Sequence, residues 1–287
     1  MQGSEAGGGS APSMAVRVVR ACRVRGYSPR TAEAYAMWAR RHGRWLRQAG
    51  VASWREAGAS HVRAFLDELA TVHHVAASTQ NQALAALLFV HDAVLGRPIG
   101  TVPGIVRAKR PLHLPTALTR REVAALLDAM HGVPRLVATL LYGSGLRLME
   151  ACTLRVQDLD LERGELVVRR GKGARDRMTM LPASAIPALS AQLRAVAAQH
   201  RRDVAAGRGW VAMPTALAVR APLQARRLAW QWLFPATRSH FDRTSGQWRR
   251  HHLHETVIQR AVTQAARDVG LARRATCHVL RHSFATH

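Results

Sequence analysis

The chain has 287 residues, of which 48% are hydrophobic and 5% aromatic, so it can bury a sizeable core and its composition excludes an intrinsically disordered protein. Lys and Arg outnumber Asp and Glu by 42 to 18, which gives a formal net charge of +24. Such a field favours polyanions, of which nucleic acid is the commonest, although ribosome-associated and membrane-surface proteins are also basic.

Cysteine usage and hydropathy restrict the setting in which the protein works. The cysteines are far apart and include no CxxC pair, so neither a disulfide framework nor a cysteine zinc site is expected. They are Cys22, Cys152 and Cys277. No apolar run is long enough to cross a membrane, and residues 1–13 predict a flexible tail rather than a secretory signal. We therefore predict a cytoplasmic protein with no membrane partner, no metal and no other cofactor.

Residues 14–97 predict a small helical domain. Ser28 followed by Pro29 indicates a helix start, because Ser caps helices and Pro is favoured in the first turn. We expect two further helices to open at Ser60 and Ser78. The apolar faces expected to be buried are Tyr35, Trp38, His42, Trp45 and Leu46; Val62, Phe65, Leu66 and Leu69; and Leu84, Leu87, Leu88, Val94 and Leu95.

Residues 98–117 predict a proline-stiffened basic linker without any acidic residue. Two interpretations are open: a solvated connector, or a strap that lies along a phosphate backbone. In the second interpretation Lys109 and Arg110 contact DNA.

A second domain with both helices and strands is expected over residues 118–287. Thr119 and Glu122 have the spacing of a capping box at its first helix. Later helical patterns cover residues 136–142, 146–154, 183–200 and 254–269, and one more begins near Thr276. Two short strands around a glycine-rich turn predict a β-hairpin over residues 165–181.

Residues 204–241 contain no Asp or Glu and interleave arginines with tryptophans. This mixture suits neutralisation of a phosphate backbone together with base stacking. Trp210, Arg226 and Arg227 are therefore candidate DNA contacts. The alternative is a loop whose tryptophans enter the core.

Four side chains stand at positions that suit phosphoryl transfer without a metal: Arg147, Lys172, His278 and Arg281. Two guanidiniums can hold the non-bridging oxygens of a phosphodiester, a lysine can protonate a leaving oxygen, and a histidine can relay a proton. Lys172 is one of only two lysines in the chain and lies between two glycines. Ordinary alternatives exist, because Arg147 could simply pair with Glu150 and a lysine in a turn is commonly solvated.

Three motifs, in this order, resemble those of tyrosine recombinases. They are LYGSGLRLMEACTLRVQDLD at residues 141–160, GKGARDR at 171–177 followed by Leu181 and Pro182, and HVLRHSFAT at 278–286. Residues 14–97 resemble the SAM-like core-binding domain of the same family. The resemblance implies a mainly α protein with a small β-hairpin or sheet, built from a helical core-binding domain and an α+β catalytic domain.

The resemblance also implies a role for each candidate residue. Arg147 and Arg281 would hold the scissile phosphate of DNA. Lys172 would act as general acid toward the 5′-oxygen, and His278 would assist proton transfer. The supporting residues would be Glu150, which orients the first motif, and His282, which is structural.

Tyrosine recombinases cleave DNA through a 3′-phosphotyrosyl intermediate, and none of Tyr27, Tyr35 and Tyr142 fits the place of the nucleophile. The last helical pattern also has no C-terminal cap. We therefore expect a C-terminally truncated fragment that binds DNA without cleaving it. Cys277 stands where the family commonly has Pro, which affects the helix cap rather than the chemistry.

Within this family the chain is similar to integron integrases, which capture gene cassettes. The similarity rests on AKRP at residues 108–111, GWVAMPTAL at 209–217 and RRHHLH at 249–254. It implies an inserted segment at about residues 201–238, contact with folded single-stranded recombination sites as well as duplex DNA, and a tetramer assembled on DNA in a bacterial cytoplasm.

A metal-binding regulator is the least favoured alternative, because neither candidate ligand set has the spacing of a closed zinc site. The two sets are Cys277, His278 and His282, and His251, His252 and His254.

Overall fold

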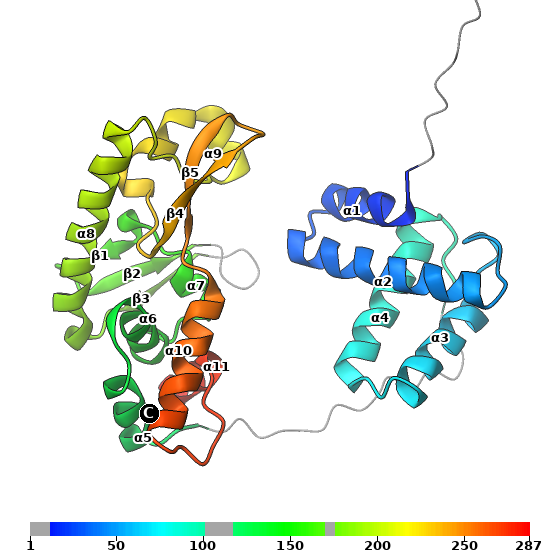
Figure 1. Ribbon diagram of the computed structural model, residues 1–287, viewed down its shortest axis with the longest axis horizontal. Coiled ribbons are helices and arrows are strands. Elements are labelled where there is room, and N and C mark those ends of the chain that lie inside the picture. The colour runs from blue at the N-terminus through cyan, green and yellow to red at the C-terminus, as the bar shows by residue number, and fades with distance from the viewer. Residues whose placement is uncertain (1–11, 101–116, 170–175) are drawn as a thin grey trace, which may run out of the picture. The chain divides into compact units, whose positions relative to one another are not determined.

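The computed structural model describes residues 12–100, 117–169 and 176–287, and the chain divides into two compact units, Met1–His113 and Leu114–His287 (Figure 1). Both units are mainly helical, and the strands that they contain form small antiparallel sheets in the second unit. The predicted fold class is thereby confirmed. Among the described residues no helix combines the length and the apolarity that crossing a membrane requires.

The first unit is a bundle of helices. Its described elements are α1 (Met14–Val24), α2 (Pro29–Gln48), α3 (Ala59–Thr71), α4 (Ala77–Phe89) and a π-helical turn at Val90–Val94. The Ser28 side chain accepts a hydrogen bond from the Thr31 backbone N–H at 3.1 Å, with Pro29 in the first turn, which confirms the predicted start of α2.

The apolar stripes of the first unit meet in its core, where Trp38, Phe65 and Leu87 are 2% exposed or less. The two further helices are present, and α3 begins at Ala59 and α4 at Ala77, one residue before the expected Ser60 and Ser78. At α3, the His61 ring nitrogen accepts the Gly58 N–H at 3.2 Å. A histidine in the first turn therefore supplies a side-chain contact at this end of the helix.

The second unit combines helices with two small antiparallel sheets. Its helices are α5 (Arg120–Asp128), α6 (Gly132–Gly143), α7 (Leu148–Cys152), α8 (Ile186–Ala205), α9 (Thr215–Arg220), α10 (Glu255–Asp268) and α11 (Cys277–Thr286). Its strands are β1 (Leu159–Asp160), β2 (Glu165–Val168), β3 (Arg177–Met180), β4 (Pro235–Asp242) and β5 (Gln247–His252). The sheet order is β1-β2-β3, and β4 and β5 form a separate pair.

Helix α11 packs against α6 with its Leu280 side chain fully buried, and a buried hydrogen bond near its C-terminal end ties it to the segment before α5. In that bond the Leu118 backbone N–H donates to the Ser283 hydroxyl at 2.9 Å. Thr119 and Glu122 form the predicted capping box at the start of α5. These contacts fix the position of α11, which carries the third predicted motif.

Strands β2 and β3 form the predicted hairpin, in antiparallel register with Val168 opposite Arg177. The turn that joins them, with Lys172, lies outside the described residues. The pairing of β4 with β5 was not predicted. Strand β4 reads Pro235-Ala-Thr-Arg-Ser-His-Phe-Asp242, and its side chains are half-buried or exposed, so it lacks the apolar alternation by which a strand is recognised.

Candidate active site

The turn before α7 places Arg147, and it requires a glycine at 145. Gly145 has φ +61°, and a Cβ added there would lie 2.4 Å from Cδ1 of Phe284 on α11. The absence of a side chain therefore lets α11 approach this turn closely. Arg147 follows as the N-cap residue of α7, with its side chain 41% exposed.

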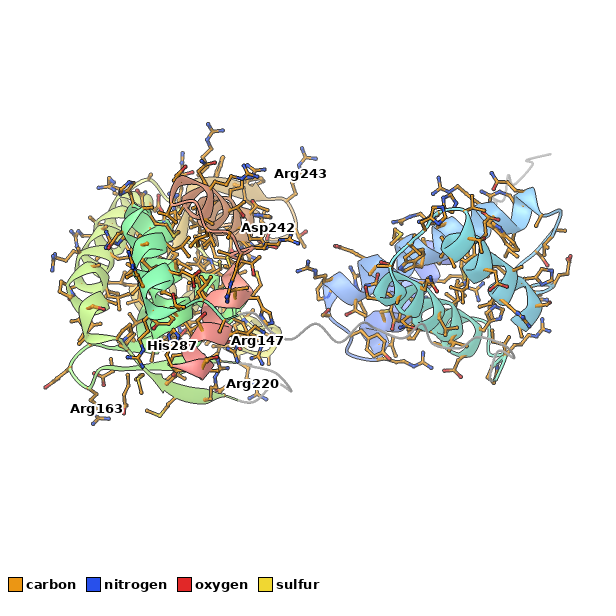
Figure 2. All side chains as sticks on the ribbon, turned by 90° about the horizontal axis from the view of Figure 1, so that it is seen from below. Arg147, Arg163, Arg220, Asp242, Arg243 and His287 are labelled. Atoms are coloured by element: carbon orange, nitrogen blue, oxygen red, sulfur yellow. The ribbon has the colours of Figure 1, made fainter. Side chains whose placement is uncertain are left out.

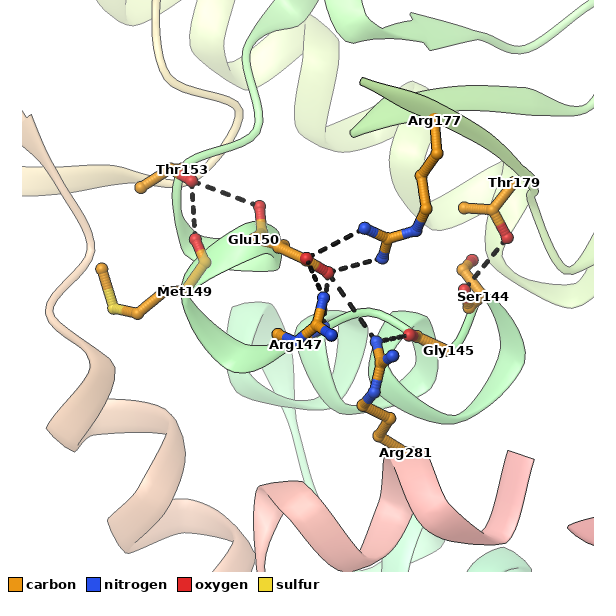
Figure 3. Close-up of polar contacts among 9 residues, drawn as sticks. All are labelled: Ser144, Gly145, Arg147, Met149, Glu150, Thr153, Arg177, Thr179 and Arg281. Atoms are coloured by element: carbon orange, nitrogen blue, oxygen red, sulfur yellow. Dashed lines mark hydrogen bonds and ion pairs between the residues drawn. The ribbon is translucent and has the colours of Figure 1, made fainter. Parts of the chain in front are cut away.

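Arg281 reaches the same turn from α11. Its guanidinium donates to the Gly145 carbonyl, and its Nη1 lies 3.8 Å from the Glu150 carboxylate (Figure 3). The Thr276 hydroxyl caps α11 by accepting the Val279 N–H at 3.3 Å. The structure thus brings together the two arginines that the sequence predicted as a phosphate grip.

Glu150 lies between these arginines and is 10% exposed. One of its oxygens accepts the Arg147 backbone N–H at 2.9 Å, and the other accepts Arg147 Nη1 at 2.7 Å. Burial raises the pKa of Glu150, but hydrogen bonds from Arg177 and Arg147 outweigh burial and bring the pKa to about 2. The expected pairing of Arg147 with Glu150 is therefore present together with the clustering of the two arginines.

A third guanidinium, which the sequence did not single out, completes this cluster. Arg177 at the start of β3 donates Nη1 to Oε1 of Glu150 at 2.9 Å and Nη2 to Oε2 at 2.6 Å. Its place as the first residue of the returning strand was the available signal, but only the folded sheet shows what it contacts. The pairing with Glu150 raises the pKa of Arg177.

His278 stands one turn before Arg281 on α11 and is exposed. Its ring lies edge-on to that of His282, with centroids 4.2 Å apart. Desolvation, and then the charges of His282, Arg281 and Arg147, lower the pKa of His278. A neutral imidazole at this place can accept a proton at neutral pH.

Lys172, Lys109 and Arg110 lie outside the described residues. In the residues the structure does describe, no group of three or more His, Cys, Asp or Glu side chains is arranged to hold a metal ion.

Some aromatic side chains of the predicted insertion are buried, and others are accessible. Trp232 is 7% exposed and Phe234 is fully buried, so these two follow the alternative in which aromatics enter the core. Arg155 stacks on the Trp232 ring with its Cζ 3.8 Å from the centroid. Trp210 is half-buried, and the Cζ of Arg226 lies 5.8 Å from its ring centroid.

Arg226 also donates to two backbone carbonyls of the same segment, both at 3.1 Å, so part of its bonding capacity is used inside the protein. Arg227 is exposed.

The β4–β5 hairpin presents aromatics that the sequence did not single out. Phe241 is 49% and Trp248 is 41% exposed, and their ring centroids are 5.7 Å apart. The Cζ of Arg208 lies 4.8 Å from the Trp248 ring centroid. Figure 2 shows Arg243, beyond the end of β4, projecting away from the unit.

Comparison with known proteins identifies relatives along both units. Residues 116–287 match the phage integrase family, and residues 15–101 match the N-terminal SAM-like domain of phage integrases. An integrase/recombinase of Escherichia coli is 42% identical over 260 residues, which cover 91% of this chain and 76% of that protein.

Solved structures share the fold at low sequence identity. A XerH site-specific recombinase bound to a palindromic difH substrate has a TM-score of 0.59 and 20% identity, and the match covers 95% of this chain and 72% of that one. A lambda integrase dimer bound to a core site has a TM-score of 0.59 and 16% identity, covering 95% and 87% of the two chains.

Proposed function

This chain belongs to the phage integrase family, and we propose from that premise that its Arg147–Arg281 pair grips a DNA phosphodiester at a site of strand exchange. Site-specific recombination by tyrosine recombinases is the activity of this family. The observation that carries the proposal is the convergence of Arg147 and Arg281 on one turn from separate motifs.

The geometry suits stabilisation of a phosphoryl transition state. Guanidiniums bind non-bridging oxygens with directed hydrogen bonds and offset the negative charge that develops there. In the family reaction a tyrosine oxygen attacks phosphorus, the bond from phosphorus to the 5′-oxygen breaks, and the departing oxygen takes a proton. We propose that Lys172 donates this proton to the departing oxygen and that His278 assists the proton transfer.

The phosphate grip is tested by the affinity of the chain for a pool of duplexes with a randomised core, measured by fluorescence anisotropy. We expect the double variant Arg147→Met/Arg281→Met to lose about tenfold or more in affinity, because two phosphate contacts disappear. The matched control is Arg135→Met/Arg163→Met, which removes two arginines that pair with Asp128 and Asp160 instead. Equal losses in the two double variants would contradict the proposal.

A second part of the proposal is that the chain with this sequence binds DNA without forming the covalent adduct. Tyr27 and Tyr35 pack against Phe89 in the first unit. The Tyr142 hydroxyl lies 2.8 Å from the ring nitrogen of His287. A nicked suicide duplex pool followed by denaturing electrophoresis tests this, and a protein band shifted by attached DNA would refute it.

We further propose that the chain acts on integron-type sites, in which folded single strands expose unpaired bases. Support comes from Trp210 and from the exposed pair Phe241 and Trp248, since flat rings beside arginines suit base stacking. Trp210→Ala is expected to lower affinity for a hairpin with extrahelical bases more than for a perfect duplex. An equal loss on both probes would count against this specificity.

The remaining assignments concern the whole protein on DNA. We propose that residues 14–97 act as the core-binding domain, that the linker at residues 98–117 contacts the phosphate backbone through Lys109 and Arg110, and that four copies assemble on a pair of sites. Arg226 and Arg227 are proposed as further backbone contacts of the insertion at about residues 201–238.

A further inference from the structure

The Glu150 carboxylate is shared unequally among its guanidinium partners (Figure 3). Arg177 binds it with two N–H donors, one to each oxygen, at 2.9 and 2.6 Å. Arg147 reaches it with one guanidinium nitrogen at 2.7 Å, and Arg281 remains 3.8 Å away. The two-pronged bond, which is the strongest arrangement for such a pair, is therefore made by the arginine outside the proposed phosphate grip.

The buried carboxylate would otherwise compete with the phosphate. Glu150 is ionised at neutral pH, because its pKa is about 2. A carboxylate and a phosphodiester accept the same kind of hydrogen bond from a guanidinium, and two anions side by side repel each other. If only Arg147 and Arg281 faced Glu150, the carboxylate would occupy them and weaken phosphate binding.

We propose that Arg177 is a positioning residue that neutralises Glu150 and so leaves Arg147 and Arg281 available for the phosphate. This inference rests on the proposed phosphate grip. The sheet holds Arg177 in place, because β3 pairs with β2 and the Thr179 hydroxyl donates to the Ser144 carbonyl at 3.1 Å.

The hydrogen bonds of the three arginines support this division of roles, whereas their exposure does not separate them, since the Arg177 side chain is 35% exposed. Arg281 is anchored on the Gly145 carbonyl, and its side chain is 27% exposed. Arg147 is 41% exposed, whereas Glu150 is 10% exposed. All three cations thus have free surface, and Arg177 is the one whose N–H donors bind both oxygens of the carboxylate.

Inorganic sulfate, a phosphate-like anion, is a suitable probe. Its affinity is read from the Nε–Hε signals of Arg147 and Arg281 in protein labelled with nitrogen-15 arginine, assigned by loss of each signal in Arg147→Met and Arg281→Met. We expect Arg177→Met to weaken sulfate binding about tenfold, the effect of one unit charge at about 6 Å in a medium of intermediate dielectric. The control Arg163→Met removes an arginine that pairs with Asp160, and its affinity should stay within about twofold of wild type.

The decisive arm is the double variant Glu150→Gln/Arg177→Met. If Arg177 acts by neutralising Glu150, removing the carboxylate charge restores sulfate affinity to within about threefold of wild type. A double variant as weak as Arg177→Met would overturn the proposal, since Arg177 would then contact the anion itself or support the fold alone. Thermal unfolding of each variant verifies that the fold persists.

The pH dependence of sulfate affinity is an independent test of the role of Arg177. Among the described residues, the charged groups around Glu150 are Arg147 before α7, Arg177 on β3 and Arg281 on α11, and His278 on α11 lies within their field. Without Arg177 the pKa of Glu150 rises, so as pH falls sulfate affinity of Arg177→Met should recover at a higher pH than any such change in wild type. The double variant retains His278 and reports its contribution, so the difference between the two profiles belongs to Glu150.

The outcomes separate this inference from the function on which it rests. If wild-type protein shows no sulfate binding at Arg147 and Arg281, the phosphate grip itself is wrong. If wild type binds and Arg177→Met binds equally well, the grip stands and the role of Arg177 is refuted.

Discussion

Gly145 is a position where the first and third motifs, both in the second unit, come close together. Its positive φ and the proximity of Phe284 make two separate demands for glycine. An alanine there would suffer left-handed backbone strain and a clash with an aromatic ring of α11. The same α11 carries Arg281, so the clash would displace half of the proposed phosphate grip.

We predict that Gly145→Ala lowers the free energy of unfolding by about 2 to 4 kcal/mol, combining backbone strain with overpacking. Gly164→Ala is the control, since it has φ +67° with open space around the added Cβ and should lose only about 1 kcal/mol. Urea denaturation measures both. Equal losses would show that the contact with Phe284 relaxes without cost.

His42 is a second residue whose surroundings determine its behaviour. It is fully buried, and within the described part of the chain neither ring nitrogen has a hydrogen-bond partner. Its ring lies among those of Trp45, Trp54 and Phe65. Desolvation, followed by the charge of His91, lowers the pKa of His42 from 6.5 to about 4.

The sign of the resulting pH dependence follows from proton uptake. The unfolded chain binds a proton near pH 6.5, whereas folded His42 binds it only near pH 4, so its stability contribution is complete above 6.5 and is lost as pH falls toward 4. We predict a loss of about 2 kcal/mol between about pH 7 and about pH 5. His42→Phe should remove most of that slope in pH-dependent melting, whereas His131→Phe should retain it. An unchanged slope in His42→Phe would assign the effect to other groups, such as the buried His91.

At the scale of elements, a buried ion pair ties the β4–β5 hairpin to α8. Arg250 on β5 donates Nε and Nη2 to the two oxygens of Asp203 on α8, each at 2.8 Å, and both side chains are 9% exposed or less. Burial raises the pKa of Asp203, but the bonds from Arg250 and Gln199 outweigh it and lower the pKa. The hairpin is thereby a fixed part of the unit.

We predict that Arg250→Met costs about 3 to 5 kcal/mol of unfolding free energy, because Asp203 would remain buried and unpaired. The double variant Asp203→Leu/Arg250→Met should recover much of that loss. Arg249→Met removes the neighbouring, more exposed pair with Asp242 and should cost about 1 kcal/mol or less. Losses of similar size for Arg249→Met and Arg250→Met in chemical denaturation would indicate that burial does not set the energy of these pairs.

At the scale of the whole molecule, the net charge of +24 should dominate association with nucleic acid. Arginines that neutralise phosphates release counterions, so affinity falls steeply with salt. We predict that raising NaCl from about 50 to about 200 mM weakens duplex binding by roughly three orders of magnitude or more, as for about six phosphate contacts. Anisotropy titrations at several salt concentrations measure the slope, and a flat response would exclude phosphate contacts as the main source of affinity.

The sequence was informative wherever one local rule determined the outcome. The stripes of α2 and α3 were predicted because their apolar residues repeat at helical spacing, and the Thr119–Glu122 box because its atoms are three residues apart. The β4–β5 pair was not predicted, because its residues do not show the alternation of apolar and polar side chains that gives a strand an apolar face. The contact between Arg177 and Glu150 depends on how β3 and α7 come together, which no short stretch of sequence encodes, and the role of Lys172 stays a prediction.

Glu150 has two roles, and substitutions at this position differ in which of them they remove. Its carboxylate both accepts the Arg147 backbone N–H at the start of α7 and balances the surrounding guanidiniums. Alanine would abolish helix cap and charge together, so a damaged phenotype would say nothing about which of the two mattered. Glutamine keeps an oxygen for the cap and discards the charge, which makes it the replacement from which genetic data at this position can be interpreted.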